Sequence, residues 1–358
     1  MKTSSALLLP GISEEAILRW MVLIMAFLVG GLAGVCAIFI AQILMNIANK
    51  YERGDASRFG GLVIVSFFYL SLVWLNGVSE LLVMSSHVLI VLSALAILFV
   101  VGVCQEFFGG FSFIKVALFL YALFGIVYWL LLNNGLTIMD EIAYLRSLPA
   151  WFAIVCLLTL LVFFVFAFHT ANGANGLVPS TSIFIVMGLI DLKFGSFGSL
   201  LSVVAIGCAI FMMFNIVLGQ VFIGAGGTYF LGSVLGVAFV YAMSLPNIDV
   251  FYLLCLFFYP SVNLLHTMVR RSVKGRFFGI VDKGYLHDLV YQRLSLIPML
   301  SSRANTFTGL LVSLAFACVP MLLHKTGEVD NWPLIYLIMA TIYSLSFILL
   351  KFNQKREL

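Results

Sequence analysis

The sequence predicts an all-α, polytopic membrane protein with about eleven transmembrane helices. Of its 358 residues, 63% are hydrophobic and only 9% are charged, which is more apolar side chain than one soluble core buries. The hydrophobic residues gather in runs that approach the roughly 20 residues needed to cross the hydrocarbon as a helix. Lys and Arg, in contrast, concentrate in alternate connections between these runs.

Eleven apolar segments are expected to form the spans, within one membrane domain covering residues 1–358. The sixth segment is the shortest. No internal repeat and no soluble domain are evident. The expected spans are residues 17–44, 62–75, 87–103, 113–132, 150–167, 182–190, 197–217, 231–245, 250–268, 306–323 and 332–350.

The distribution of basic residues predicts the topology. Fourteen of the nineteen Lys and Arg residues fall in the connections after odd-numbered spans, which places the N-terminus outside and the C-terminus in the cytoplasm. The net charge of +4 then reflects topology and attraction to anionic lipid, not nucleic-acid binding. The apolar stretch at 7–10 is too short for a cleavable signal peptide and is followed by Glu14 and Glu15, so the first span is expected to be retained.

The six cysteines lie singly within or at the ends of the apolar segments. They are expected to be small buried hydrophobic residues, and neither a disulfide framework nor a metal site is expected. They are Cys36, Cys104, Cys156, Cys208, Cys255 and Cys318.

Five polar connections fall on the expected cytoplasmic side. In the first, "SRFGG" places Arg58 beside Gly60 and Gly61, a combination that holds a phosphate close to the backbone or forms an ordinary basic turn. The second contains Gln105 and Glu106, with Lys115 nine residues after Glu106. A helix cap and an interfacial lysine are the alternatives to chemistry there.

The remaining three connections carry amides, glycines and basic residues. In "HTANGANG", Asn172 and Asn175 each precede a glycine, which is also common in plain turns. The stretch "GQVFIGAGGTYFLG" at 219–232 has the glycines of a phosphate-handling loop and no acid. The last, at 270–295, is suited to binding a diphosphate or to acid–base steps, unless it is simply a basic loop on the lipid surface. It contains Arg276, Asp282, Lys283, His287 and Asp288.

Taken in order, these connections resemble those of the polyprenyl-phosphate N-acetylhexosamine-1-phosphate transferase family, across residues 46–293. The family's first loop, Asp-x-Pro-Asn followed by Pro-Arg-x-Gly-Gly, keeps its Arg-x-Gly-Gly here but has Asn46 for the Asp and Ala48 for the proline. The family's second loop begins Asp-Asp, where this chain has Gln105 and Glu106, and its lysine corresponds to Lys115.

The other three family loops are matched with similar departures. The third, Asn-x-x-Asp-Gly-x-(Asp/Asn)-Gly-Leu, begins here at His169, and Asn172 replaces its acid. In the fourth, Gly224 and Gly227 are retained and Asn215 fits upstream, but Ala225 replaces the metal-binding Asp. In the fifth, residues matching the family are Gly275, Arg276, Asp282, Leu286 and His287, while Lys283 replaces an arginine and Tyr285 and Asp288 replace histidines.

The resemblance implies transfer of a sugar 1-phosphate from a UDP-sugar to a polyprenyl phosphate, with Mg²⁺ at the diphosphate, at the cytoplasmic face of a bacterial inner membrane. It implies catalytic positions at Glu106, Asn172, Asp282 and His287, with Glu106 and Asp282 as candidate metal ligands. The implied substrate-binding positions are Arg58, Gly60, Gly61, Lys115, Asn175, Asn215, Gly224, Gly227, Arg276 and Lys283.

The departures weaken the implied metal site. Of four core acids only Glu106 is still a carboxylate, since Gln105, Asn172 and Ala225 occupy the other positions. Mg²⁺ needs carboxylate oxygens, and losing several kcal/mol of metal stabilisation slows transfer on the order of a thousandfold or more. The expectation is a catalytically impaired relative that still binds a polyprenyl phosphate or nucleotide sugar, as a homodimer or as the partner of an active cell-envelope enzyme.

Three alternatives stay open. The first is an active transferase with a relocated metal site, formed by Glu106, Asp282, Asp288 and His287. Otherwise Arg58, Lys115 and Arg276 neutralise a diphosphate without metal, which favours binding over turnover. A lipid or solute transporter is the third alternative, although the spans lack the internal charges that are typical of transporters.

Overall fold

The structure is a computed structural model that describes most of the chain after residue 57. The described residues are 58–78, 85–108, 112–136, 142, 147–192, 194–219, 221–246, 248–273, 275, 284–327 and 329–354, with isolated positions between 32 and 43. Within these ranges the elements are helices and none is a β-strand. Seven helices are long and apolar enough to cross a membrane, so the expectation of an all-α, multi-pass membrane protein is confirmed. The first expected span, 17–44, lies almost wholly outside the described residues.

The first four described helices match expected spans closely. Each is one long apolar run that ends at a polar or glycine-containing connection. Ser112 caps the third of them by accepting a hydrogen bond from the backbone N–H of Lys115, as helix N-termini require. The helices are α2 (Gly61–Val78), α3 (Ser86–Phe108), α4 (Phe113–Asn133) and α7 (Ala150–Thr170).

The next three helices begin earlier in the chain than expected. They are α8 (Leu177–Ile190), α9 (Gly195–Leu218) and α10 (Gly224–Ser244). The expected starts at 182 and 231 are therefore wrong, whereas the membrane-spanning part of α9 begins at Phe197, as expected. The largest difference is at α10, because the glycine-rich stretch predicted to be a turn is helical from Gly224 onward.

The C-terminal helices contain two irregularities. The expected span 250–268 is broken into α11 (Val250–Leu256) and α12 (Phe258–Val273), which meet at an angle of 80°. A turn of π-helix, η2 (Leu314–Cys318), lies between α14 (Ala304–Ser313) and α15 (Val319–Thr326). The other elements are α13 (Leu286–Ser295), the short 3-10 helix η1 (Ser301–Arg303) and α16 (Trp332–Gln354).

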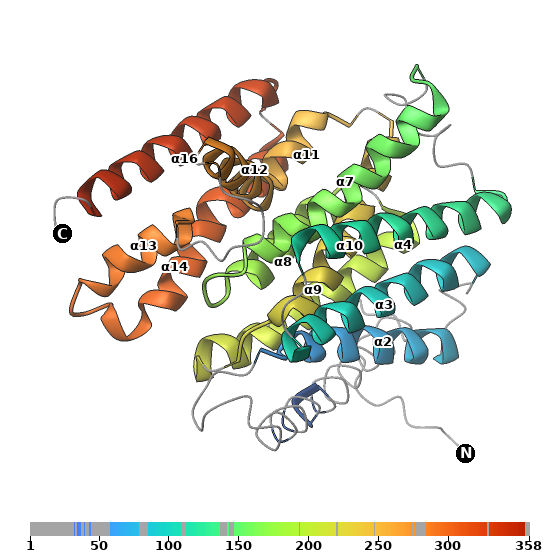
Figure 1. Cartoon of the computed structure of the whole chain (residues 1–358), viewed down its shortest axis with the longest axis horizontal. Helices are drawn as coiled ribbons and strands as arrows, with labels where there is room; N and C mark the ends of the chain where they lie inside the picture. Colours follow the sequence, from blue (N-terminus) through green and yellow to red (C-terminus); the bar gives the residue numbers. More distant parts are fainter. Residues whose placement is uncertain are drawn as a thin grey trace, which may run out of the picture.

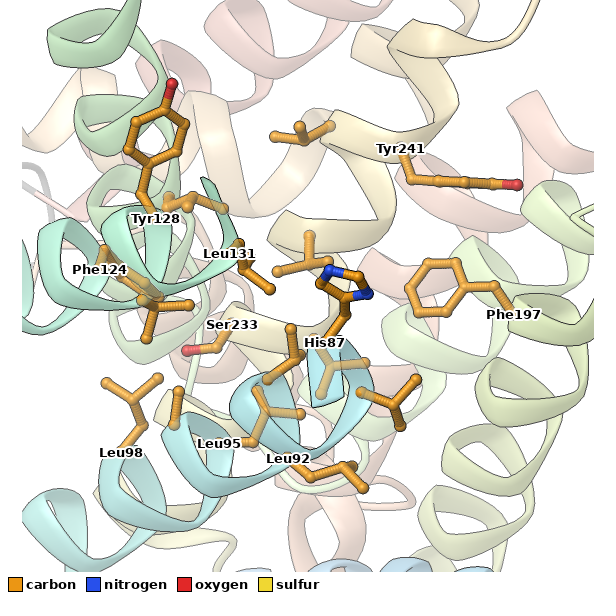
Figure 2. A pocket seen from close by; sticks show the side chains of 18 of the residues that line it. His87, Leu92, Leu95, Leu98, Phe124, Tyr128, Leu131, Phe197, Ser233 and Tyr241 are labelled. Atoms are coloured by element: carbon orange, nitrogen blue, oxygen red, sulfur yellow. The ribbon is translucent and has the colours of Figure 1, made fainter. Parts of the chain in front are cut away.

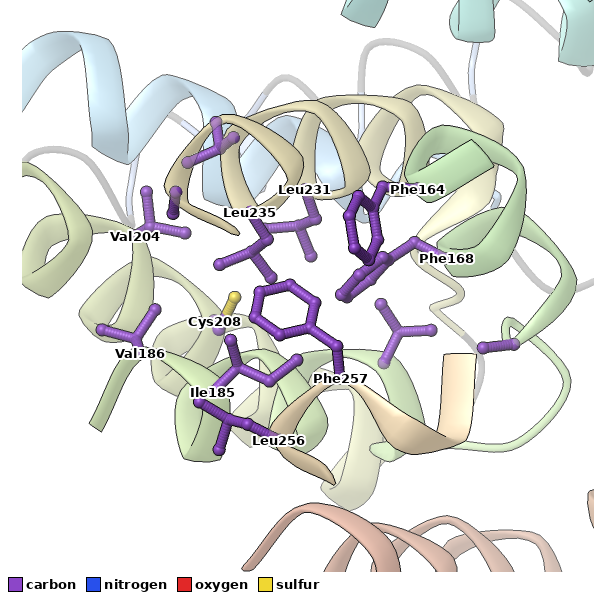
Figure 3. Close-up of a cluster of buried hydrophobic side chains, with 14 of the residues drawn as sticks. Phe164, Phe168, Ile185, Val186, Val204, Cys208, Leu231, Leu235, Leu256 and Phe257 are labelled. Atoms are coloured by element: carbon purple, nitrogen blue, oxygen red, sulfur yellow. The ribbon is translucent and has the colours of Figure 1, made fainter. Parts of the chain in front are cut away.

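Helix α10 is the centre of the fold. It packs against α2, α3 and α7, and Figure 1 shows these helices lying side by side. In its most apolar stretch 83% of the residues are buried, compared with 17% in the peripheral α16. Figure 3 shows the adjoining core, in which Leu231 and Leu235 of α10 face Phe164 and Phe168 of α7.

Glycine explains why α10 fits so closely among its neighbours. A Cβ atom added to Gly226 lies 2.8 Å from Val103 and 3.1 Å from the carbonyl oxygen of Phe99, both on α3. A Cβ atom added to Gly232 lies 2.8 Å from backbone atoms of α7. Small residues allow helix backbones to approach in this way inside membranes, so these glycines determine the packing of α10.

The cysteines fit the expectation only in part. All six are free thiols, but only Cys208 and Cys255 are buried and Cys36 is exposed. The expectation that all six are buried is therefore wrong. Cys36, Cys104, Cys156 and Cys318 lie at or near helix surfaces, where a lipid environment accepts an apolar thiol as readily as a protein core does.

Candidate functional site

The polar connections meet at one end of the helix bundle. The structure brings together there the starts of α2, α8, α10, α13 and α14 and the ends of α3, α7 and α9. Described parts of all five sequence-predicted loops take part, and we refer to this group of helix ends as the loop cluster. The contacts that join them are direct side-chain and backbone interactions.

Glu106 links three of the predicted loops. Its Oε1 atom accepts a 2.9 Å hydrogen bond from the backbone N–H of Ala225 in the first turn of α10. Its Oε2 atom lies 3.7 Å from Nη1 of Arg58. The N-cap residue of α10, Ile223, supplies no capping side chain, so the carboxylate from α3 satisfies one of the unpaired N–H groups at this positive helix end.

Glycines bring the first and fourth loops into backbone contact. Gly60 and Gly61 donate hydrogen bonds of 2.8 Å and 2.9 Å to the carbonyl oxygens of Phe222 and Ile223. A Cβ atom on Gly61 lies 2.4 Å from the Cα atom of Gly227. Gly224 has a φ of +70°, and a Cβ atom there lies 1.8 Å from the Arg58 carbonyl oxygen, so no other residue fits at this position without moving the backbone.

Two buried asparagines fasten the third loop. Asn215 of α9 accepts a 2.6 Å hydrogen bond from the backbone N–H of Gly176 and donates one of the same length to the carbonyl oxygen of Val221. Its amide also reaches Oδ1 of Asn175 at 3.4 Å. Both asparagines are at most 5% exposed. In this arrangement Asn215 holds the loops in place, and its amide is already committed to protein partners, one of which is Oδ1 of Asn175.

His287 joins the third and fifth loops. Its ring lies against Gly173, where an added Cβ atom would be 1.8 Å from Nε2. Its Nδ1 atom is 2.7 Å from the hydroxyl oxygen of Tyr259, and Nε2 is 3.8 Å from Oδ1 of Asp288. The residue is 1% exposed, and burial lowers the pKa of His287 to about 4. The imidazole is therefore neutral at pH 7.

A second layer of polar contacts lies beneath the loop cluster. His169 Nδ1 is 3.2 Å from the hydroxyl oxygen of Thr228, which donates to the carbonyl oxygens of Gly224 and Ala225. Tyr229 donates a hydrogen bond to Oε1 of Gln105. Gln105 therefore holds α3 to α10 through a neutral contact.

Further polar residues complete this layer on the other side of the bundle. The Asn263 amide donates to the Thr170 carbonyl oxygen at 3.2 Å, and the Tyr343 hydroxyl donates to Asn263 Oδ1 at 3.3 Å. Asn263 is fully buried. These contacts tie α12 and α16 to the end of α7, and thereby to the third loop.

The remaining predicted residues are not joined to the loop cluster by described contacts. Lys115 is exposed at the start of α4, and neither its ammonium group nor the Asn172 amide makes a hydrogen bond or ion pair with another residue described by the structure. Gly275 has a φ of +61°, as a tight turn requires. Arg276, Asp282 and Lys283 lie outside the described residues.

The described residues show no cluster of side chains of the kind that holds a metal ion. Among them, no group of three or more His, Cys, Asp or Glu side chains is close enough together to hold a metal ion. Glu106 is held by a backbone N–H and Arg58, and His287 faces Tyr259 and Gly173. No protein-family model and no curated protein sequence matches the chain.

Several contacts at the site could not be predicted from the sequence. His169–Thr228, Tyr229–Gln105 and Tyr259–His287 each join residues that are distant along the chain and carry no local signal. Tyr229 and Thr228 lie in the stretch predicted to be a turn, so their helical positions on α10 were not evident. The sequence allows Glu106 to be a helix cap, and the structure shows that it caps a different helix from its own.

Proposed function

We propose that the chain is a divergent relative of the polyprenyl-phosphate N-acetylhexosamine-1-phosphate transferases that binds an anionic substrate at the loop cluster but transfers no sugar phosphate. The ligand is a polyprenyl phosphate or a nucleotide sugar. In this proposal the chain has eleven spans, an outside N-terminus and a cytoplasmic C-terminus, in a bacterial inner membrane. It acts in cell-envelope polysaccharide synthesis, as a homodimer or as the partner of an active enzyme.

The observation that carries the proposal is the way Glu106 is used. This is the one carboxylate left among the four core acidic positions, and it caps α10 and pairs with Arg58. A carboxylate engaged in this way has fewer lone pairs left to coordinate Mg²⁺. Phosphoryl transfer depends mainly on positioning and charge neutralisation, so the absence of free acids at the described positions favours binding without turnover.

The basic residues provide the binding half of the proposal. The Arg58 side chain is 59% exposed although it contacts Glu106, and Lys115 is exposed, with no described partner for its ammonium group. Both belong to loops of the expected cytoplasmic side, so their charges are available to a phosphate group at the membrane surface. The neighbouring glycines allow a ligand to approach the backbone.

A binding measurement with undecaprenyl phosphate tests the proposal. The full chain is reconstituted in nanodiscs, and the affinity for the lipid is compared among wild type, Arg58→Ala and Lys115→Ala. Each substitution is expected to weaken binding about tenfold, since a charge-assisted hydrogen bond contributes about 1.5 kcal/mol. Arg303→Ala is the matched control, because Arg303 is also an exposed basic residue near the loop cluster. Equal affinities in all four proteins would refute the proposed site.

The active-enzyme alternative differs in a turnover assay. Release of UMP is measured with a panel of UDP-sugars and undecaprenyl phosphate, with and without Mg²⁺ or Mn²⁺. The proposal predicts no UMP above background. Metal-dependent UMP that disappears in Glu106→Ala and Asp282→Ala would instead establish a transferase with a rearranged metal site.

One observation favours the transporter alternative, namely the 80° break between α11 and α12. Broken helices in transporters expose backbone groups and charges to a substrate near the membrane centre. Here the polar side chains after the break already bond to protein groups and not to a substrate. Tyr259 contacts His287, and Asn263 bonds to Thr170 and Tyr343. The break therefore serves the loop cluster in our proposal. Flux of a substrate through proteoliposomes would favour the transporter.

A further inference from the structure

A cavity of about 380 Å³ lies in the half of the bundle that faces away from the loop cluster. Its walls come from the N-terminal half of α3, the C-terminal halves of α4 and α10, the middle of α7 and the start of α9. The opposite ends of α3, α7, α9 and α10 contribute to the loop cluster. In Figure 2, Leu98, Phe124 and Ser233 lie on one side of the view, Phe197 and Tyr241 lie on the other, and His87 lies between them.

The depth of the cavity corresponds to one leaflet of a bilayer. Along α3 its lining extends from His87 to Leu98, and along α10 from Ser233 to Ser244. Each stretch rises ~16 Å at 1.5 Å per residue, about half of a hydrocarbon core that is ~30 Å thick. His87 and Tyr241 lie at the outer end, where side chains with a polar tip are typical of the membrane interface.

Three of the polar side chains in the walls, those of His87, Ser233 and Ser244, already have hydrogen-bond partners in the protein. The Nε2–H group of His87 donates to the carbonyl oxygen of Asn134 at 2.9 Å. The hydroxyls of Ser233 and Ser244 donate at 2.7 Å to the carbonyl oxygens of Tyr229 and Tyr241. Nearly all other lining side chains are Leu, Val, Ala or Phe. A cavity of this kind offers water few partners and favours an apolar occupant.

From this geometry we infer that the cavity binds one acyl chain of a membrane phospholipid, drawn from the leaflet opposite the loop cluster. The glycerol end of the lipid lies near His87 and Tyr241, and the chain terminus reaches Leu98 and Ser233 near the membrane centre. Protein interiors are packed at nearly crystal density, so an apolar space of this size within the bilayer is occupied by hydrocarbon. The inference does not depend on the proposed function, because the cavity and the loop cluster occupy opposite halves of the bundle.

Photocrosslinking with two phospholipid probes tests the inference. The full chain is placed in nanodiscs containing phosphatidylethanolamine with a diazirine either at the end of one acyl chain or close to the glycerol. Adducts are then mapped by peptide mass spectrometry. The chain-end probe is expected to label the segments around Leu98 and Ser233, and the glycerol-side probe those around His87 and Ser244. The reverse order, or the same positions with both probes, would overturn the inference.

Substitutions inside and outside the cavity provide the control. Val237→Trp places an indole in the cavity wall and is expected to reduce cavity adducts at least fivefold. Val100→Trp makes the same change at a 55% exposed position of α3 outside the lining and is expected to leave them unchanged. Ser233→Leu serves as a second filling variant if Val237→Trp does not fold, and the same fivefold loss is expected.

Two further results would contradict the inference. In the first, adducts spread over the lipid-exposed faces of α4 and α16 and do not respond to Val237→Trp. In the second, unlabelled undecaprenyl phosphate displaces the probe at a concentration where an equal amount of unlabelled phosphatidylethanolamine does not. The second result would make a polyisoprenoid the occupant instead of an acyl chain.

Discussion

The two ends of the helix bundle differ in how closely they are packed. At the loop cluster, backbones approach so closely that Gly61 and Gly227 have no room for a Cβ atom, and buried amides, hydroxyls and one carboxylate bond to one another. At the other end, the same helix α10 helps to form a cavity of about 380 Å³ with apolar walls. Helix α10 is therefore tightly packed among polar groups at its start and leaves space for hydrocarbon at its end.

This difference predicts which substitutions lower the stability of the protein. Close backbone contacts and buried polar groups should make the loop cluster sensitive to single atoms, whereas the cavity should tolerate added methylenes. Four predictions follow this contrast, in order of decreasing effect. Free energies of unfolding refer to reversible denaturation of the full chain in detergent.

The largest effect is expected from Gly61→Ala. The new methyl group lies 2.4 Å from the Gly227 Cα atom, and neither backbone can move without separating α2 from α10. We expect a loss of about 3 kcal/mol or more, at the upper end of overpacking costs. Gly125→Ala is the matched control, because the nearest atom to its Cβ position is 3.9 Å away. Alanine should stabilise that helical position by about 0.5–1 kcal/mol. Equal effects would show that the close contact does not exist.

The second effect is a dependence on pH that is due to His287. Its pKa of about 4 in the folded protein lies below the ordinary 6.5, so the unfolded chain binds more protons in between. Stability from this residue is complete above pH 6.5 and is lost as the pH falls toward 4. At pH 5 the loss should be about 2 kcal/mol. The measurement compares unfolding of wild type and His287→Gln from pH 7 to pH 4.5. Parallel curves would contradict a buried, neutral imidazole.

The third effect concerns the cap on α10. Glu106→Ala leaves the Ala225 N–H without its partner, and we expect a loss of about 1.5 kcal/mol. Glu106→Gln keeps an acceptor oxygen and should cost less than half as much. The difference between the two variants, measured by denaturant unfolding, reports the hydrogen bond. If glutamine destabilises as strongly as alanine, the negative charge and its pairing with Arg58 matter more than the cap.

The smallest effect is expected in the cavity. Val237→Leu adds one methylene to the cavity wall, where displaced hydrocarbon makes room, so stability should change by less than about 0.5 kcal/mol. Gly226→Ala also adds one carbon to α10, but its Cβ atom lies 2.8 Å from Val103, and it should cost more than about 1 kcal/mol. Thermal unfolding of the pair measures the contrast directly. A large loss in Val237→Leu would mean that the cavity is closed and rigid.

Much of the fold could be predicted from hydrophobic runs alone. Helices α3, α4 and α7 begin within a residue of their expected starts because each begins where a polar connection ends. The start of α10 could not be predicted, since glycine-rich sequence is typical of turns. It is helical here because Gly61, Gly102 and the α10 glycines pack backbone against backbone, and a tertiary contact of this kind leaves no local pattern.

The candidate site was predictable in its members more than in their roles. The structure brings together predicted residues of the first, second and fourth loops, namely Arg58, Gly60, Gly61, Glu106, Gly224 and Gly227. It also brings Asn215 and His287 to the third loop, which contains Asn175. The sequence indicated ligand binding for Asn175 and Asn215, and the structure shows the Asn215 amide bonded to the backbones of Gly176 and Val221 and to Oδ1 of Asn175. Which partner satisfies a buried amide depends on the meeting of distant segments, and one-dimensional patterns do not contain that information.

The most direct test of the central claim is a titration of Mn²⁺, a paramagnetic substitute for Mg²⁺, followed by electron paramagnetic resonance. If Glu106 caps α10 and holds no metal, wild type and Glu106→Gln, which retains the cap, should give superimposable titrations. A saturable Mn²⁺ site in wild type that is lost in Glu106→Gln would contradict the account and make Glu106 a metal ligand.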